Sequence, residues 1–113
     1  MRLARSIDLY LETCYRTRTV ARADEFAAKW VRYDRSHLNR LATEVLGMRL
    51  HEYLRQQQLA HATRLLRTTP LSIEEIAAAS AFGTPWAFYR HFKKAFGMTP
   101  HQYRQSLGNL AAK

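Results

Sequence analysis

Residues 84–104 read TPWAFYRHFKKAFGMTPHQYR. The first two residues are typical of a helix start, because a threonine hydroxyl caps free backbone amides and proline suits the first turn. Gly97 is typical of a helix end, where the chain often turns left-handed. The stretch therefore predicts a helix over about residues 85–96. Three phenylalanines at four-residue intervals are expected to point from this helix into the core: Phe88, Phe92 and Phe96.

A shorter helix is predicted just before this one. Ser72 and Glu75 form a capping box, in which each side chain accepts a hydrogen bond from the other residue's backbone amide. Ile73 and Ile76 then begin an apolar face at helical spacing. Residues 81–83, Ala-Phe-Gly, interrupt this pattern and supply a turn. Two helices joined by a short turn that contains glycine are typical of a helix-turn-helix unit.

The same unit is expected to occur earlier in the chain. When the sequence is shifted by 50 positions without gaps, residues 20–55 give eight identities, against roughly two expected from ordinary composition. Among them, Arg40 coincides with Arg90. The repeat predicts helices over about residues 22–30 and 35–46, joined by a turn over residues 31–33. The other identities place Glu25, Ala27, Ala28, Gly47, Met48, His51 and Tyr53 on Glu75, Ala77, Ala78, Gly97, Met98, His101 and Tyr103.

The remaining segments also favour helices. Residues 49–68 contain no glycine or proline and carry an apolar stripe, so they predict one long helix. Further helices are expected over about residues 6–16 and after Thr99. The predicted fold is all-α, with seven helices. Its parts are an N-terminal helix-turn-helix subdomain in residues 1–48, a linker helix in residues 49–68 and a C-terminal helix-turn-helix subdomain in residues 69–113.

The charge of the chain favours a polyanionic partner. Its 113 residues include 18 Lys and Arg against nine Asp and Glu, which gives a formal net charge of +9. Such a surplus indicates nucleic acid first and an anionic membrane second. The longest uncharged run, residues 76–86, is too short and too mixed to span a bilayer. Asp8 and Glu12 interrupt the basic start, unlike in a signal peptide. We therefore expect a cytoplasmic protein without membrane contact.

A long helix between two such units suits the reading of double-stranded DNA. In a helix-turn-helix the second helix enters the major groove, while the first lies across the backbone. A linker of about 19 residues would be ~28 Å long at ~1.5 Å per residue. Successive major-groove faces on one side of B-DNA lie ~34 Å apart. The two reading helices are therefore expected to enter consecutive major grooves of a direct repeat, and the site need not be palindromic.

The exposed stripes of the two reading helices supply candidate DNA contacts. Arginine reads guanine and asparagine reads adenine through paired hydrogen bonds, whereas lysines late in such a helix face phosphate. Surface salt bridges are the alternative for Arg40 and Arg90, a solvated face is the alternative for the lysines, and packing on a neighbouring helix is the alternative for Trp86. The candidate base contacts are Ser36, Asn39, Arg40, Trp86, Tyr89 and Arg90, and the candidate phosphate contacts are Arg35, Lys93 and Lys94.

Three stretches follow the patterns of a known family. Residues 88–104 fit F-x-R-x-F-K-K-x-F-G-x-T-P-x-x-Y-R, and residues 53–66 fit Y-x-R-x-x-R-x-x-x-A-x-x-L-L except that Gln58 stands where arginine is usual. With residues 71–77, these stretches resemble the DNA-binding domain of the AraC/XylS family of bacterial transcription regulators. The resemblance covers about residues 7–105. It implies two helix-turn-helix subdomains on a long helix, with base contacts from the positions named above.

The chain departs from the family pattern in three places. Ala81 stands where glycine is usual in the second turn, although Gly83 lies nearby. Ala42 and Thr43 replace a Phe-Lys pair, which removes a core aromatic residue and a phosphate contact, so we expect the first unit to hold DNA less firmly. Residues 85–87, Pro-Trp-Ala, are bulkier and less polar than usual, which changes the expected base preference.

No catalytic or metal site is predicted. Residues 51–55, His-Glu-Tyr-Leu-Arg, begin like a zinc motif, but arginine stands in place of the second histidine. The single cysteine, Cys14, excludes an internal disulfide and a multi-cysteine metal site. We therefore expect neither a cofactor nor an enzymatic activity.

The expected function is that of a sequence-specific, double-stranded DNA-binding transcription regulator. Many family members carry a separate ligand or dimerisation domain, for which this chain has no room, so we expect a stand-alone regulator or an excised domain. It is expected to bind DNA as a monomer unless fused to a further domain, with RNA polymerase or other transcription machinery as its protein partner. Two alternatives use the same charge: a non-specific or architectural nucleic-acid-binding protein, and a helical interaction module for an acidic partner.

Overall fold

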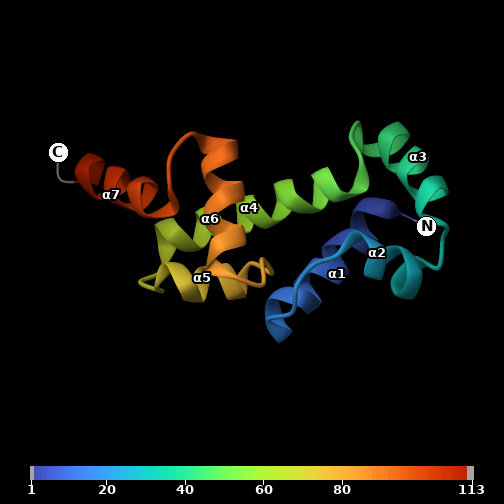
Figure 1. The fold of residues 1–113 in the computed structure, drawn as a ribbon, viewed down its shortest axis with the longest axis horizontal. Helices are drawn as coiled ribbons and strands as arrows, with labels where there is room; N and C mark the ends of the chain where they lie inside the picture. Colours follow the sequence, from blue (N-terminus) through green and yellow to red (C-terminus); the bar gives the residue numbers. More distant parts are fainter. Residues whose placement is uncertain (1, 112–113) are drawn as a thin grey trace.

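The computed structural model describes residues 2–111, and their regular structure is helical throughout. A π-helical segment, η1, continues α2 without a break, so these residues form seven helices and no strand (Figure 1). This confirms the predicted all-α fold with seven helices. The elements are α1 (Leu3–Thr17), α2 (Ala23–Glu25), η1 (Phe26–Val31), α3 (Arg35–Leu46), α4 (Leu50–Thr68), α5 (Ile73–Ala79), α6 (Pro85–Phe96) and α7 (Pro100–Ala111).

The long helix α4 is shared by two hydrophobic cores. It runs along the length of an elongated molecule of 49 × 27 × 22 Å (Figure 1). The N-terminal core joins α1, α2, η1 and α3 to the first half of α4, including Leu50 and Leu54. The C-terminal core joins α5, α6 and the second half of α4, including Leu59, Ala62 and Leu66. None of the helices within residues 2–111 has the length and apolar character needed to cross a membrane.

Local capping residues set the ends of α5 and α6. The Ser72 hydroxyl accepts from the Glu75 amide at 3.1 Å, and the Glu75 carboxylate accepts from the Ser72 amide at 3.2 Å, which confirms the capping box. The Thr84 hydroxyl accepts from the Ala87 amide at 3.1 Å, and proline follows as the first residue of α6. Gly97 ends this helix with a left-handed φ of 74°.

The first unit has the same arrangement of two helices and a turn, but its first helix and its turn differ in length from those of the second unit. Asp34 caps α3, because its carboxylate accepts from the amides of Ser36 and His37. The helix before it ends at Val31, four positions after Ala27, whereas its counterpart α5 ends at Ala79, two positions after Ala77. The helical segment that ends with η1 therefore includes two residues whose counterparts in the second unit lie in the turn. The turn predicted over residues 31–33 is wrong by one residue for this reason, since Val31 belongs to η1.

One predicted core residue lies at the surface instead. Phe88 and Phe92 are fully buried, but Phe96 keeps 43% of its surface exposed. The prediction of a buried Phe96 is wrong because eight residues at ~100° each rotate a side chain by about 80° beyond two full turns. The Phe96 ring rests against the edge of the core, with its centroid 4.5 Å from that of Phe92.

Candidate nucleic-acid interface

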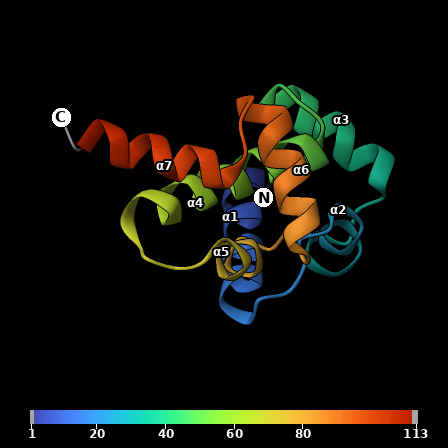
Figure 2. The ribbon, with the colours of Figure 1, turned by 60° about the vertical axis from the view of Figure 1, so that its left-hand side comes forward.

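The second helices of both units are accessible on the same side of the molecule. Figure 1 shows α3 and α6 at different positions along the long axis, with α4 running between them. In Figure 2 both lie on one side, while α7 extends to the other side. They also run in the same sense, because the N-terminal end of each is its lower end in both views. The two helices are thus repeated along the axis of α4 without being turned around.

The exposed stripe of α6 carries all the candidate residues of the second unit. Trp86 is 69% exposed and therefore is not buried against a neighbouring helix. Tyr89 is 41% exposed, and Arg90 lies beside it at the surface. Together with Lys93 and Lys94, these residues line one shallow hollow of ≈ 380 Å³. The structure therefore brings two aromatic rings and three cationic groups together on one helix face.

The exposed stripe of α3 is smaller and more mixed in charge. Ser36 and Arg40 are exposed, and Arg40 lines a hollow of ≈ 380 Å³ with Asn39, Thr43, Glu44 and Arg49. Within residues 2–111 neither Arg40 nor Arg90 forms an ion pair, so the surface salt bridge considered as their alternative role is not observed there. Both guanidinium groups are therefore free to meet a ligand.

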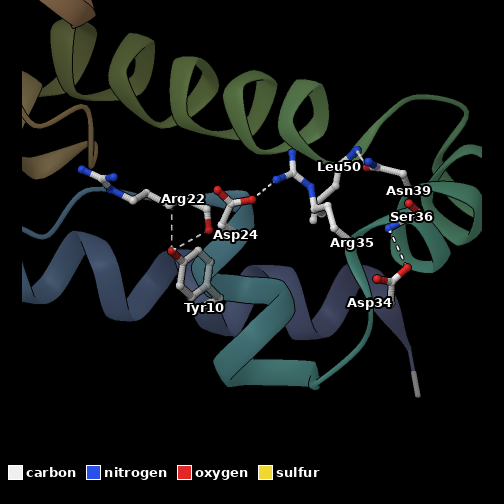
Figure 3. A network of polar contacts seen from close by, with 8 residues as sticks. All are labelled: Tyr10, Arg22, Asp24, Asp34, Arg35, Ser36, Asn39 and Leu50. Atoms are coloured by element: carbon white, nitrogen blue, oxygen red, sulfur yellow. Dashed lines mark hydrogen bonds and ion pairs between the residues drawn. The ribbon is translucent and has the colours of Figure 1, made fainter.

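Two of the candidate residues already have partners within the protein. The amide oxygen of Asn39 accepts from the backbone amide of Leu50 at 3.3 Å, which caps the first turn of α4 (Figure 3). Arg35 forms an ion pair with Asp24, and its side chain is only 39% exposed (Figure 3). Both residues would have to give up or share these bonds to contact DNA. Their place in the interface stays a prediction.

The buried tyrosine of the first unit fixes the loop that leads into these residues. The Tyr10 hydroxyl accepts from the Arg22 amide at 2.8 Å (Figure 3). It also donates to the Glu25 carboxylate at 2.8 Å. Because Tyr10 is almost wholly buried, desolvation raises the pKa of its phenol far above the usual range. The phenol therefore stays neutral and holds the start of α2, next to Asp24, in place.

A comparison with known protein families identifies this arrangement. The family described as "Helix-turn-helix domain" matches residues 27–106, which is well over half of the chain. The chain belongs to the AraC-type helix-turn-helix family. This confirms the resemblance carried by the sequence patterns.

The AraC-type chain is similar to parts of longer curated proteins. It is 42% identical over 73 residues to the HTH-type transcriptional regulator GlxA of Rhizobium meliloti (strain 1021), a match that covers 65% of the chain and 22% of GlxA. It is 35% identical over 74 residues to the HTH-type transcriptional activator AarP of Providencia stuartii, a match that covers 66% of the chain and 55% of AarP. The chain therefore spans from about a fifth to just over half of these relatives' length.

Solved structures share the fold of the AraC-type chain over nearly its whole length. The DNA-binding domain of the global transcriptional factor AdpA, solved in complex with a target DNA, has a TM-score of 0.80 and 27% identity, covering 92% of this chain and 90% of that one. The C-terminal domain of the two-component response regulator yesN from Fusobacterium nucleatum subsp. nucleatum ATCC 25586 has a TM-score of 0.78 and 26% identity, covering 92% and 99%.

The AraC-type domain also has a basic groove between its linker helix and α6, which was not predicted. The groove has a volume of ≈ 630 Å³, and its lining includes His51, Glu52 and Arg55 from α4 and His91 and Lys94 from α6. Nη1 of Arg55 lies 2.6 Å from Nε2 of His91. The sequence does contain a signal for Arg55, which is the arginine of the Y-x-R pattern, but its pairing with α6 depends on how the two helices pack.

The electrostatics of this groove keep the His91 imidazole neutral. Burial, followed by the nearby charges of Arg55, Arg90 and Lys94, lowers the pKa of His91 to about 4. A guanidinium group only donates hydrogen bonds, so a neutral imidazole nitrogen is the acceptor that suits Arg55. Burial also lowers the pKa of Arg55 itself. The groove thus places the cationic groups of Arg55 and Lys94 between α4 and α6.

Proposed function

We propose that the chain is the sequence-specific DNA-binding domain of a transcription regulator and that it inserts α3 and α6 into successive major grooves of one duplex. The observation that carries this proposal is the placement of the two helices on one side of the molecule and in one sense, at different positions along its long axis. With 19 residues, α4 is ~28 Å long at ~1.5 Å per residue. This length approaches the ~34 Å that separates successive major-groove faces.

The comparisons support a DNA ligand. The AdpA domain, similar in fold and 27% identical, was solved in complex with a target DNA. The printed names of GlxA and AarP describe a transcriptional regulator and a transcriptional activator. We extend these properties to this chain as part of the proposal, with RNA polymerase or other transcription machinery as its protein partner and with one copy of the chain on each cytoplasmic DNA site.

The two helices divide the proposed contacts between base edges and phosphates. Arg40 and Arg90 occupy equivalent positions, and each is free to donate two hydrogen bonds to a guanine. Lys93 and Lys94 lie in the last turn of α6, where side chains leave the groove and reach phosphates. We assign base contacts to Ser36, Asn39, Arg40, Trp86, Tyr89 and Arg90, and phosphate contacts to Arg35, Lys93 and Lys94.

A selection experiment tests the function directly. Duplexes bound by the chain are selected from a random pool, and the affinity of the selected site is compared with that of a scrambled site over a range of salt concentrations. We expect the selected site to bind at least ~10³ times more tightly than the scrambled one. Equal affinity for both sites would favour the non-specific or architectural alternative. Failure to retard any duplex would favour the interaction module.

A further inference from the structure

A set of contacts ties the two units together away from the reading helices. We call this set the brace, and it has five members. The Tyr15 and His61 rings stack with centroids 3.9 Å apart, and Nη1 of Arg18 donates to the Glu75 carbonyl at 3.4 Å. The Ala21 amide donates to the Ala81 carbonyl at 3.1 Å, and Val20 packs on Gly83. Gln58 of α4 is the fifth member.

Gln58 is the buried centre of the brace. Only 3% of its surface is exposed, and it lies on α4 between the parts of that helix that enter the two cores. Its side-chain amide donates to the Ala81 carbonyl at 2.9 Å and to the Ser80 carbonyl at 3.2 Å. These carbonyls lie at the C-terminal end of α5, where a helix leaves acceptors without partners. Gln58 therefore fixes the turn between α5 and α6 against α4.

The same turn is held from its other side by the first unit. The Ala81 carbonyl accepts from both Gln58 and the Ala21 amide, and the Ala81 side chain belongs to the N-terminal core. Gly83 (φ 85°) leaves room for Val20, because a Cβ atom at position 83 would lie 2.7 Å from Cγ2 of Val20. The turn that orients α6 is therefore packed against the unit that contains α3.

We propose that the brace fixes the distance and angle between α3 and α6, and that Gln58 is a positioning residue that sets which half-site spacing the chain accepts. The inference rests on the proposed function and adds a determinant of specificity that lies outside the DNA-contacting helices. One added base pair moves a half-site by about 3.4 Å and rotates it by about 34°. A braced pair of helices cannot follow such a change, so a wrong spacing loses the contacts of one helix.

A spacing series tests this inference. The selected duplex is lengthened or shortened by one base pair midway between its two half-sites, and the affinity of each duplex is measured for the full chain. For the wild type we expect each altered spacing to lower affinity roughly tenfold or more, as when a base contact is lost. Gln58→Met keeps the side-chain volume but removes both hydrogen bonds. We expect it to reduce this preference to about threefold or less, through weaker binding at the selected spacing and a smaller loss at the others.

Two further variants separate loosened geometry from general destabilisation. Ile76→Val removes one methylene from the C-terminal core but makes no brace contact, so it should keep the wild-type spacing profile. Val20→Ala trims the contact with Gly83 at a partly exposed site and should relax the profile in the same direction as Gln58→Met. If circular dichroism shows that Gln58→Met is unfolded, the spacing profile of Val20→Ala tests the role of the brace instead.

The outcomes distinguish this inference from the proposed function. A folded Gln58→Met chain with the wild-type spacing profile would overturn the role of the brace while leaving sequence-specific binding intact. The same result for Val20→Ala would overturn it where Gln58→Met does not fold. A wild-type chain that selects no sequence at all would instead remove the proposed function, and the brace inference with it.

Discussion

Within residues 2–111, three residues other than glycine hold a backbone conformation that favours glycine. Arg18, Arg32 and Ala81 have φ values of 57°, 55° and 64°. For an L-residue this left-handed conformation costs roughly 1–2 kcal/mol. Arg18 and Arg32 are exposed, whereas Ala81 is buried in the N-terminal core. The backbone strain is therefore similar at all three residues, but only at Ala81 does the side chain gain buried contacts that offset it.

Replacing these residues by glycine should separate strain from packing. We expect Arg32→Gly to raise the free energy of unfolding by about 1 kcal/mol, because glycine adopts this conformation freely. We expect Ala81→Gly to change it much less, because losing a buried methyl group costs ~0.8 kcal/mol and offsets the relief. Urea unfolding of both variants measures the difference. Equal stabilisation of both would mean that the Ala81 methyl group contributes little to the core.

The two kinds of proposed DNA contact should respond differently to alanine. Arg90→Ala should lower affinity for the selected site by ~1–3 kcal/mol and relax base choice at one position, because it removes a paired hydrogen bond to a base. Lys94→Ala should weaken all sequences alike and reduce the slope of log affinity against log salt by about 1. Fluorescence anisotropy with the selected and scrambled duplexes measures both effects. An unchanged base preference in Arg90→Ala would remove its base-reading role.

At the scale of the elements, helices with local end signals could be predicted from the sequence. Residues 85–96 form α6 as predicted, because Thr84, the following proline and Gly97 each act through neighbouring atoms. The π-helical segment η1 could not be predicted, because its residues carry no local signal for wider turns. The ungapped repeat gives no sign of it, because the two extra helical residues are compensated by a turn that is shorter by two residues.

Contacts between helices at the candidate site also could not be predicted from the sequence. Arg40 and Arg90 follow from the repeat register and lie exposed on α3 and α6. The pairing of Arg55 with His91, and of Gln58 with the turn after α5, depends on the packing of α4 against distant segments. No spacing rule within one element indicates such contacts. Asn39 shows the same limit, because its bond to Leu50 joins two helices.

The contact between α4 and α6 should make stability depend on pH. The pKa of His91 is about 4 in the folded chain, below the usual 6.5. As pH falls from 6.5 towards 4, the unfolded chain takes up a proton first, so stability should fall over this range. His91→Asn should reduce the fall but not abolish it, because burial also lowers the pKa of His61. Thermal unfolding at pH 7 and pH 5 checks this, and an identical fall in both proteins would contradict it.

At the scale of the whole molecule, the order and sense of α3 and α6 should determine the symmetry of the proposed DNA site. Most paired helix-turn-helix units belong to two-fold dimers, which read inverted repeats. Here α3 and α6 run in the same sense along one elongated body (Figures 1 and 2). The two units also carry different side chains on their exposed stripes. The chain should therefore read an asymmetric site in one orientation.

Inverting half of the selected site tests this consequence. We expect a duplex in which one half-site is reversed to bind no more tightly than a duplex in which the same half-site is scrambled, because one of the two helices then meets the wrong base edges. Competition binding with the two duplexes measures this. A reversed duplex that binds as tightly as the selected one would show that the relative sense of α3 and α6 does not constrain the site.

The seating of Ala81 in the N-terminal core has a consequence for how the chain unfolds. Because that core includes a residue that follows α4 in the chain, the N-terminal half is not closed by its own residues alone. Loss of the C-terminal half would expose apolar surface in the N-terminal half, which links the two energetically. The whole chain should then melt in a single cooperative step, with equal calorimetric and van't Hoff enthalpies. Two separate thermal transitions would show instead that the halves are independent.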